Sequence, residues 1–381
     1  MKDLRMVDLK GQYERIKGEI DSAIQSVIDS TAFIRGPEVN MFEEELASYL
    51  GVKHVISCAN GTDALQVAIM ALGLQAGDEI ITTDFTFIAS AEVIALLGLK
   101  PVFVEPATDT FNIDPAAIEK AIGPRTKAIL PVHLFGQTAE MEKILKIARR
   151  HKLFVIEDAA QATGAEYIFS DGTRKKAGSM GTAGCTSFFP SKNLACFGDG
   201  GAVFTNNDEL AKTMRSITNH GSTIKYYHDH VGVNSRLDTL QAAILRVKLR
   251  YLDEYNLSRR NAASWYDRQL SPVEQLATPL RSDSSTHIFH QYTIKTEPEI
   301  RDELKKYLAA NNIPSMIYYP VPMHKQKAYS YLGLADKDFP VTESLCSSVL
   351  SLPMHTELKI SQLQYVSDHI HRFFEKIPGH E

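Results

Sequence analysis

Lys192 is the most suggestive residue of this sequence, because it follows an apolar run and precedes a cluster of glycines. In the stretch TSFFPSKNLACFGDGGAVFTNN, Gly198, Gly200 and Gly201 come shortly after the lysine. Glycines at this density mark a tight turn or a backbone that a ligand approaches closely. A lysine amine is a nucleophile that can form a Schiff base with an aldehyde. Most lysines are simply solvated, so the neighbouring motifs must decide between a loop lysine and a catalytic one.

A carboxylate ends a second apolar run, in KLFVIEDAAQATGAEY. Glu157 and Asp158 close the run, and the small residues Ala159 and Ala160 come next. A carboxylate at this place either caps a helix or pairs with a cationic atom of a ligand. Small neighbours leave room for a planar group to lie flat, which a cap would not require. The stretch is therefore a candidate site for a flat ligand with a cationic atom.

A candidate phosphate site follows the run KHVIS. In CANGTDALQVA, Gly61 and Thr62 open a predicted helix. A helix start offers free backbone N–H groups and the positive end of the helix dipole, and a glycine lets an anion approach. The alternative is an ordinary Asn/Gly turn with Thr62 as the cap, and this motif alone does not exclude it.

Two aromatic residues, Phe85 and Phe87, follow the run DEIITT, at a strand end instead of its middle. Either ring could cover the face of a flat ligand, although an aromatic at such a place is more often part of the core. The stretch GCTSFFPSK adds Ser187 and Lys192 beyond another apolar run. Because ligands of parallel α/β sheets bind beyond the carboxyl ends of the strands, these residues are expected to meet at one edge.

The segments that must position these groups alternate between the sequence pattern of β-strands and that of α-helices. Short β-rich runs are separated by stretches with helical spacing, which is typical of a mostly parallel sheet covered by helices. The clearest predicted strands lie near 53–57, 78–83, 100–104, 126–132 and 152–158, and the clearest helices near 61–74 and 138–152.

A different pattern begins near residue 235. One long amphipathic helix is predicted over 236–255, because apolar residues keep helical spacing there. A smaller mixed α+β unit follows, with a strand near 290–295 and helices near 301–312 and 361–374. We therefore predict a large α/β domain over 1–250 and a small C-terminal α+β domain over 251–381.

The four places together supply a phosphate site, an aromatic cover, a carboxylate and an amine nucleophile at neighbouring strand ends. Pyridoxal phosphate is the cofactor whose binding calls for such a lysine, an aspartate at the pyridine nitrogen and a phosphate cradle. The glycines after Lys192 would let the chain turn tightly beside it. The sequence thus predicts a pyridoxal-phosphate enzyme with Lys192 and Asp158 as its central residues.

Composition excludes several other classes of function. The 381 residues are 44% apolar and 23% charged, with a net charge of −5 and no basic block that would favour nucleic acid. The four cysteines are far apart, so neither a metal site nor a disulfide framework is predicted. The chain starts with a charged segment and contains no apolar run long enough for a membrane span. We expect a cytoplasmic protein that binds neither nucleic acid nor membranes.

Over nearly its whole length the chain resembles the DegT/DnrJ/EryC1/StrS family of pyridoxal-phosphate-dependent nucleotide-sugar aminotransferases. The segments that carry the resemblance are FIRGPEVNMFEEELASYLG, CANGTDALQVAI, VIEDAAQATGAEY, SFFPSKNLACFGDGGAVFTNNDELA, GVNSRLDTLQAAIL and YYPVPMHKQ. The resemblance implies the aspartate aminotransferase type of fold, fold type I. It also implies a homodimer in which each active site is shared between two subunits.

The resemblance assigns a role to each candidate residue. Lys192 would bond to the cofactor's aldehyde, Asp158 would pair with the pyridine nitrogen, and Gln161 would lie beside the phenolic oxygen. The remaining cofactor contacts would be made by Gly61, Thr62 and Ser187 at the phosphate, Phe87 and Ala160 at the two ring faces, and Asn234 at the phosphate of the partner subunit.

The substrates implied are a keto nucleotide sugar and an amino acid donor, L-glutamate. The segments HGSTIKYYHDHVGVNSR and SFFPSKNLACFGDGGA look most like the branch that acts on UDP-2-acetamido-2-deoxy-3-oxo-glucuronate in surface polysaccharide biosynthesis. Candidate sugar-nucleotide contacts are Arg236, Tyr227, His228, Tyr318 and Tyr319. Many members have His-Tyr-Pro where this chain has Tyr318-Tyr319-Pro320, and a tyrosine cannot carry a positive charge near neutral pH.

Three alternatives stay open, and the presence of Lys192 argues against a fourth, dehydration of the sugar. The chain could aminate another 3-keto or 4-keto sugar linked to dTDP, UDP or GDP. Relatives that dehydrate sugars carry a histidine in place of Lys192, and a non-catalytic regulatory member would be expected to lose Lys192 or Asp158. A nucleotide-binding α/β module without this cofactor would be favoured by a G-x-G-x-x-G or phosphate-loop motif, and the sequence has neither.

Overall fold

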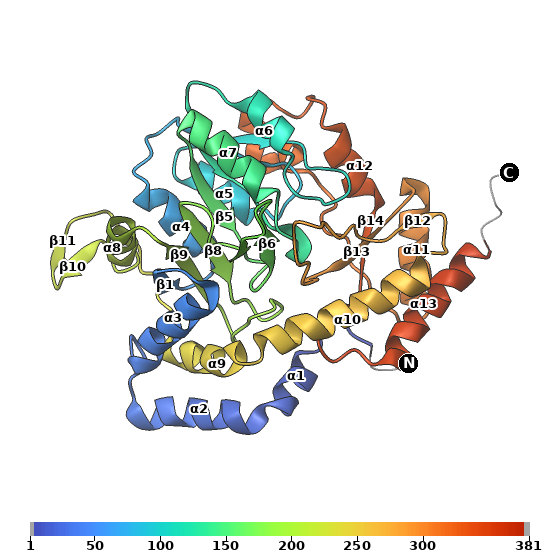
Figure 1. Cartoon of the computed structure of the whole chain (residues 1–381), viewed down its shortest axis with the longest axis horizontal. Coiled ribbons are helices and arrows are strands. Elements are labelled where there is room, and N and C mark those ends of the chain that lie inside the picture. The colour runs from blue at the N-terminus through green and yellow to red at the C-terminus, as the bar shows by residue number, and fades with distance from the viewer. Residues whose placement is uncertain (1–3, 377–381) are drawn as a thin grey trace.

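A seven-stranded sheet forms the centre of the molecule in the computed structural model, which describes residues 4–376 (Figure 1). Strand β9 pairs antiparallel with both of its neighbours, and the other neighbouring pairs are parallel. The mostly parallel α/β sheet predicted from the sequence is therefore present. In spatial order its strands are β1 (His54–Cys58), β9 (Gly201–Thr205), β8 (Ala183–Ser187), β5 (Phe154–Asp158), β4 (Thr126–Leu130), β2 (Glu79–Thr83) and β3 (Lys100–Val104).

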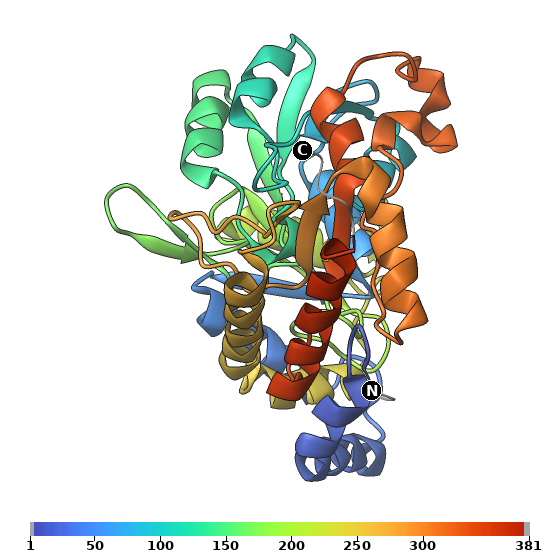
Figure 2. The same cartoon turned by 90° about the vertical axis from the view of Figure 1, so that its right-hand side faces the viewer.

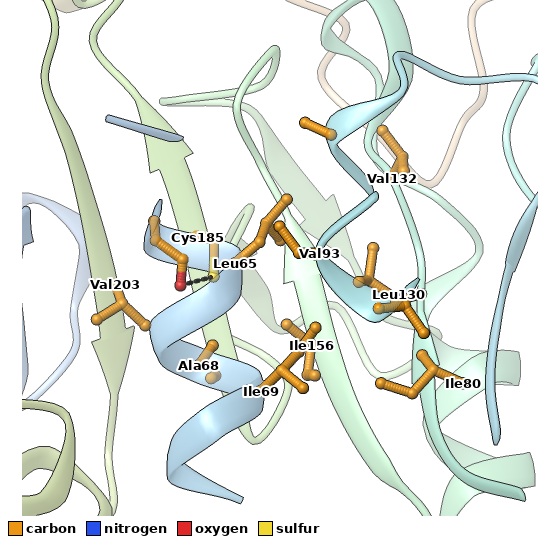
Figure 3. Packing of buried hydrophobic residues seen from close by; sticks show 14 of the residues in the cluster. Leu65, Ala68, Ile69, Ile80, Val93, Leu130, Val132, Ile156, Cys185 and Val203 are labelled. Carbon is orange, nitrogen blue, oxygen red and sulfur yellow. Dashed lines mark hydrogen bonds between the residues drawn. The ribbon is translucent and has the colours of Figure 1, made fainter. Parts of the chain in front are cut away.

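Different helices cover the two faces of the sheet, because side chains alternate along each strand. On β2, Ile80 belongs to the apolar cluster that includes residues of α4, α5 and α8, whereas the next residue, Ile81, belongs to the cluster that includes residues of α6 and α7. In Figure 3, Leu65 of α4 lies over the sheet beside Cys185 and Val203. The helices are α4 (Gly61–Ala71), α5 (Ala89–Leu96), α6 (Pro115–Ala121), α7 (Met141–His151) and α8 (Asp208–Ile217).

Helices α3 (Pro37–Leu50) and α9 (Thr239–Leu249) pack together on the part of the sheet formed by β1 and β9. Val55 and Phe204 of these two strands lie in the same cluster as Leu46 of α3 and Leu245 of α9. Of the two N-terminal helices, α1 (Leu9–Arg15) and α2 (Lys17–Ser30), the second extends along α9 at the lower edge of Figure 1.

The C-terminal part forms a smaller α+β unit with its own apolar core. Its antiparallel sheet has the order β12 (Leu276–Ala277), β13 (Tyr292–Thr296) and β14 (Val349–Leu352). Figure 2 shows α13 (Ile360–Phe374) between α10 (Leu252–Leu270) and α11 (Pro298–Ala310), and α13 contacts both helices. The core includes Tyr266, Tyr292 and Leu350, and also Leu4 from the start of the chain.

The prediction of one long helix over 236–255 is wrong, because two helices, α9 and α10, occupy this region. The break lies at Arg250 and Tyr251, where the N–H of Tyr251 donates to the carbonyl of Lys248. Tyr251 packs against α1 and α2, while Leu252 belongs to the core under α3. Apolar spacing continues through the break, so periodicity alone could not reveal it.

The remaining elements are short. They are β6 (Glu166–Ile168), β7 (Arg174–Lys176), β10 (Ser222–Ile224), β11 (Tyr227–His228), α12 (Pro340–Ser348) and the 3-10 turns Leu134–Gly136, Met323–Lys325 and Lys327–Leu332. Within residues 4–376, no helix combines the length and apolar character of a membrane span. The same range contains no cluster of His, Cys, Asp and Glu suited to a metal ion.

Candidate active site

A cavity of about 790 Å³ lies at the carboxyl ends of the sheet strands. The ends of β5 and β8, the start of α4 and the segment around Tyr319 all contribute to its wall. The structure thus brings together most of the residues predicted from the sequence. Those that line the cavity are Gly61, Thr62, Phe87, Asp158, Ala160, Gln161, Ser187, Lys192, Tyr318 and Tyr319.

Asp158 is the last residue of β5 and is buried at the wall of the cavity. Ser90 Oγ donates to Asp158 Oδ2 over 2.8 Å, and the N–H of Ala160 donates to Oδ1 over 3.1 Å. Sequence reasoning missed Ser90. It stands in the first turn of α5, just after the DFTF segment, and a hydroxyl so close to a predicted strand end was the available signal.

Glu157 faces the other side of the sheet and is fully buried. The N–H of Ala139 donates to His133 Nδ1, so the ring's other nitrogen carries the proton and donates to Glu157 over 2.9 Å. The N–H groups of Met180 and Gly181 also donate to Glu157. Glu157 is therefore used inside the protein, so that of these two neighbouring residues Asp158 is the one available to a ligand.

Lys192 lies in the turn after β8, and its N–H donates to the carbonyl of Phe189 over 2.8 Å. Burial lowers the pKa of its amine to about 8, and the charge of Asp158 acts in the opposite direction. A larger share of neutral amine is therefore present near neutral pH than for a solvated lysine. The neutral amine is the form that attacks an aldehyde.

The start of α4 is pressed against β8 and β9, which explains two of the glycines. A Cβ on Gly61 would lie 2.6 Å from Cβ of Ser187, and one on Gly201 would lie 2.3 Å from the carbonyl oxygen of Asn60. Asn60, not Thr62, is the N-cap, since its side chain accepts from the N–H of Asp63. The result is a small cradle at a helix N-terminus, which suits a phosphate.

The two aromatic residues of the DFTF segment differ in how deeply they are buried. Phe85 is 1% exposed and belongs to the core, whereas Phe87 is 54% exposed and lines the cavity. The ring of Phe87 lies 6.3 Å from the ring of Tyr319. Gln161 accepts from the N–H of Phe135 over 2.8 Å and donates to Tyr319 OH over 3.0 Å. Phe87 is thus the aromatic side chain that is free to contact a ligand.

Four predicted residues do not line this cavity. Arg236 lines a separate cavity of about 330 Å³ together with Arg35 and Arg215. Burial lowers the pKa of Arg35, and the charges of Arg236 and Arg215 lower it further. Asn234 is exposed near Arg236, and Tyr227 and His228 lie exposed on the β10–β11 hairpin, which projects from the body in Figure 1.

The residues of the large cavity fit pyridoxal phosphate. The cradle at Gly61 is too tight for a side chain but open to an anion, and a buried carboxylate and an amine of lowered pKa line the same cavity. Sequence reasoning did not identify several other lining residues, which are Asn60, Asp63, Thr86, Val132, Phe135, Phe189, Ser191, Asp199, His290 and Gln291.

Comparisons with known proteins agree with this site. Residues 14–371 match the DegT/DnrJ/EryC1/StrS aminotransferase family. A pleiotropic regulatory protein of Geobacillus stearothermophilus is 48% identical over 97% of this chain and 98% of its own. The UDP-2-acetamido-2-deoxy-3-oxo-D-glucuronate aminotransferase of Pseudomonas aeruginosa is 46% identical over 95% of this chain and 98% of its own.

Solved structures share the fold. The crystal structure of S. venezuelae DesV in complex with ketimine intermediate has a TM-score of 0.95 and 41% identity, covering 99% of this chain and all of that one. The predicted fold type I, pyridoxal phosphate as cofactor and the enzyme class, a nucleotide-sugar aminotransferase, are therefore confirmed. The chain belongs to the DegT/DnrJ/EryC1/StrS aminotransferase family.

Proposed function

We propose that the protein transfers the amino group of L-glutamate to UDP-2-acetamido-2-deoxy-3-oxo-glucuronate in surface polysaccharide biosynthesis. The observation that carries the proposal is the 46% identity to the Pseudomonas enzyme named for this substrate. The arginine-lined cavity agrees with it, because arginine binds carboxylates and phosphates through two parallel hydrogen bonds. Neither Arg35 nor Arg236 has a carboxylate partner among the ion pairs of residues 4–376.

When bound, the cofactor supplies an aldehyde that captures amines and a ring that accepts the electron pair of the broken C–H bond. Lys192 would take the proton from the donor's α-carbon and later return a proton to the sugar carbon. Asp158, held by Ser90, would keep a proton on the pyridine nitrogen. Gln161 would lie beside the phenolic oxygen.

The rest of the cavity would bind and orient the cofactor. Gly61, Thr62 and Ser187 would hold its phosphate at the start of α4, where N–H groups are free. Phe87 and Ala160 would pack on the ring faces. Tyr318 and Tyr319 would contact the sugar, since both line the cavity.

We further propose a homodimer with shared active sites. Among the described residues, Asp63, Asp158 and Asp199 line the cavity, and Lys192 is its one amine. The donor, the nucleotide sugar and the cofactor's phosphate are all anionic, so positive charge must come from elsewhere. The exposed hairpin residues Tyr227 and His228 and the half-buried Arg236 lie outside their own subunit's cavity and would supply contacts in the neighbouring one. Asn234 would reach the neighbour's cofactor phosphate.

We also propose a division into two domains and a cellular location. A large domain over 1–250 and a small one over 251–381 would place the cavity beside their junction, with the break between α9 and α10 as the boundary. A cytoplasmic location agrees with the four cysteines, Cys58, Cys185, Cys196 and Cys346, all of which are free thiols.

The test of the substrate compares the 3-keto uronic acid with a neutral 4-keto nucleotide sugar. Arg236→Lys should weaken use of the uronic acid and leave the half-reaction with glutamate intact, because glutamate reacts before the sugar enters. Arg246→Lys is the matched control, since Arg246 is paired with Glu45 and Glu38 on α3. Faster amination of the neutral sugar, or equal damage to both half-reactions, would contradict the assignment. A protein that shows no spectral change with glutamate would instead be a regulatory family member.

A further inference from the structure

Asp84 and His324 form a buried pair that joins the end of β2 to the segment carrying Tyr318 and Tyr319. The N–H of His324 donates to Asp84 Oδ1 over 2.8 Å, and His324 Nδ1 lies 2.5 Å from Asp84 Oδ2. The carbonyl of Asp84 also accepts from the N–H of Met323 over 3.1 Å. Both side chains are 0% exposed. The two residues are 240 positions apart, so this contact exists only in the folded protein.

Asp84 opens the segment 84–90, which gives the active site two of its groups. Phe87 lines the cavity, and Ser90 donates to Asp158. The N–H of Asp84 donates to the carbonyl of Val104 over 2.9 Å, which fixes the segment to the neighbouring strand. A shift of Asp84 would therefore change the placement of Phe87 and Ser90.

His324 comes shortly after Tyr318 and Tyr319 in the chain, and these two tyrosines line the cavity together with Phe87. Tyr319 accepts from Gln161, and its ring meets the ring of Phe85 edge-on at 6.0 Å. The imidazole of His324 stacks on Phe339 at 4.5 Å. Its second nitrogen lies 3.5 Å from Glu343 Oε1. The ring is thus held from several sides, so it transmits the position of Asp84 to the segment 318–325.

Stability alone is a weak reason for such a pair. Apolar side chains of similar volume often stabilise a core as well as a buried polar or ionic contact does. Two hydrogen bonds to one carboxylate add direction, because they fix an angle as well as a distance. Burial raises the pKa of the Asp84 carboxyl, and the bonds from His324 act against that rise. The hydrogen bonds from His324 thus favour the charged form of Asp84.

We propose that Asp84 and His324 are positioning residues for the aminotransferase reaction. The pair holds the segments 84–90 and 318–325 at a fixed separation and so sets the fit of ligands between Phe87 and Tyr319. Neither Asp84 nor His324 lines the cavity, so both act through the residues that do.

Three variants separate positioning from general stability. His324→Leu removes the ring donor and keeps apolar volume, and His324→Asn retains an N–H near the place of Nδ1. Thr342→Val is the matched control. Thr342 is also fully buried, and its hydroxyl and N–H donate to Glu105 over 2.6 and 2.9 Å. This contact likewise joins a strand end to the C-terminal part, but neither Thr342 nor Glu105 leads into the cavity wall.

The first measurement is hydrogen exchange of the cofactor-free protein in peptides covering 84–90 and 316–326, followed by the dissociation constant of pyridoxal phosphate. Loss of a hydrogen bond to a charged group corresponds to roughly tenfold or more in an equilibrium. His324→Leu should speed exchange in both peptides and weaken cofactor binding by about that factor. The KM for the keto sugar should rise more than kcat falls. His324→Asn should recover most of the loss, and Thr342→Val should show neither effect.

Unchanged exchange and cofactor binding in His324→Leu would overturn the proposal. So would the same losses in Thr342→Val, because they would show that any weakened link between the two parts has this effect. If His324→Leu does not fold, Asp84→Asn replaces it, since it keeps the side-chain volume and removes one acceptor. Unchanged exchange and cofactor binding in Asp84→Asn, or the same losses in Thr342→Val, would then overturn the proposal.

Discussion

Ser90 holds Asp158 through a hydrogen bond of 2.8 Å, so the first turn of α5 orients the carboxylate at the end of β5. The N–H of Ala160 binds the other carboxylate oxygen. Ser90 Oγ also lies 3.2 Å from the hydroxyl of Thr86, which keeps it in place. The carboxylate proposed to pair with the cofactor's pyridine nitrogen is therefore oriented by the protein itself.

Ser90→Ala should slow the proton transfer from the donor by about tenfold to a hundredfold, the range expected for one hydrogen bond to a charged group. Single-turnover absorbance with glutamate measures this step. Ser216→Ala is a suitable control, because Ser216 is a buried serine of α8 whose hydroxyl makes no hydrogen bond. Equal rates in Ser90→Ala and the parent protein would show that Asp158 does not need this donor.

Asp158→Asn should reduce the rate far more, because it keeps the shape of the side chain and removes the negative charge proposed to keep the pyridine nitrogen protonated. We expect the proton step to slow by several powers of ten, each worth about 1.4 kcal/mol of barrier. The matched variant Glu157→Gln should lower thermal stability and leave the chemistry of the cavity largely intact, since Glu157 bonds to His133 and backbone N–H groups. Near-normal turnover in Asp158→Asn would be incompatible with its proposed role.

The pKa of Lys192, lowered to about 8, predicts a pH dependence. Burial favours the neutral amine, so the rate at which cofactor-free protein bonds to pyridoxal phosphate should rise with pH and level off above about 8. The unfolded chain keeps this proton up to about pH 10.4. Stability of the cofactor-free protein should therefore increase as pH rises between these values, and Lys192→Met should remove that increase. A midpoint near 10 for cofactor attachment would contradict the burial argument.

Much of the fold was predictable, because β-rich runs and helical periods alternate up to about residue 235. Lys192, Asp158 and Gly61 could also be identified, since each comes within a few residues of the end of an apolar run. The pair of Asp84 and His324 could not, because its members are 240 positions apart and nothing in their two segments indicates that they meet. The break between α9 and α10 was missed for a related reason: the apolar spacing continues through it, although Tyr251 and Leu252 pack in two different clusters.

Mixing two inactive variants tests the shared active site. Lys192→Ala subunits keep Asn234, and Asn234→Ala subunits keep Lys192, so a mixed dimer would contain one intact site. Activity should therefore return when subunits exchange, up to about a quarter of that of the parent dimer for random pairing and independent sites. Exchange must be shown separately with tagged subunits. Mixed dimers that form and remain inactive would mean that each subunit completes its own site.

The chemistry proposed for the cavity depends on which lysine bonds to the cofactor, and borohydride reduction followed by peptide mapping identifies that lysine. The chain contains a matched competitor, Lys248, whose pKa burial also lowers to about 8 but which lies outside the cavity beside Phe197. If the geometry of the cavity determines the site, the reduced cofactor will be found on the peptide containing Lys192, and Lys192→Ala will carry no label. Label on Lys248, or on any other lysine of the parent protein, would show that Lys192 is not the residue that binds the cofactor.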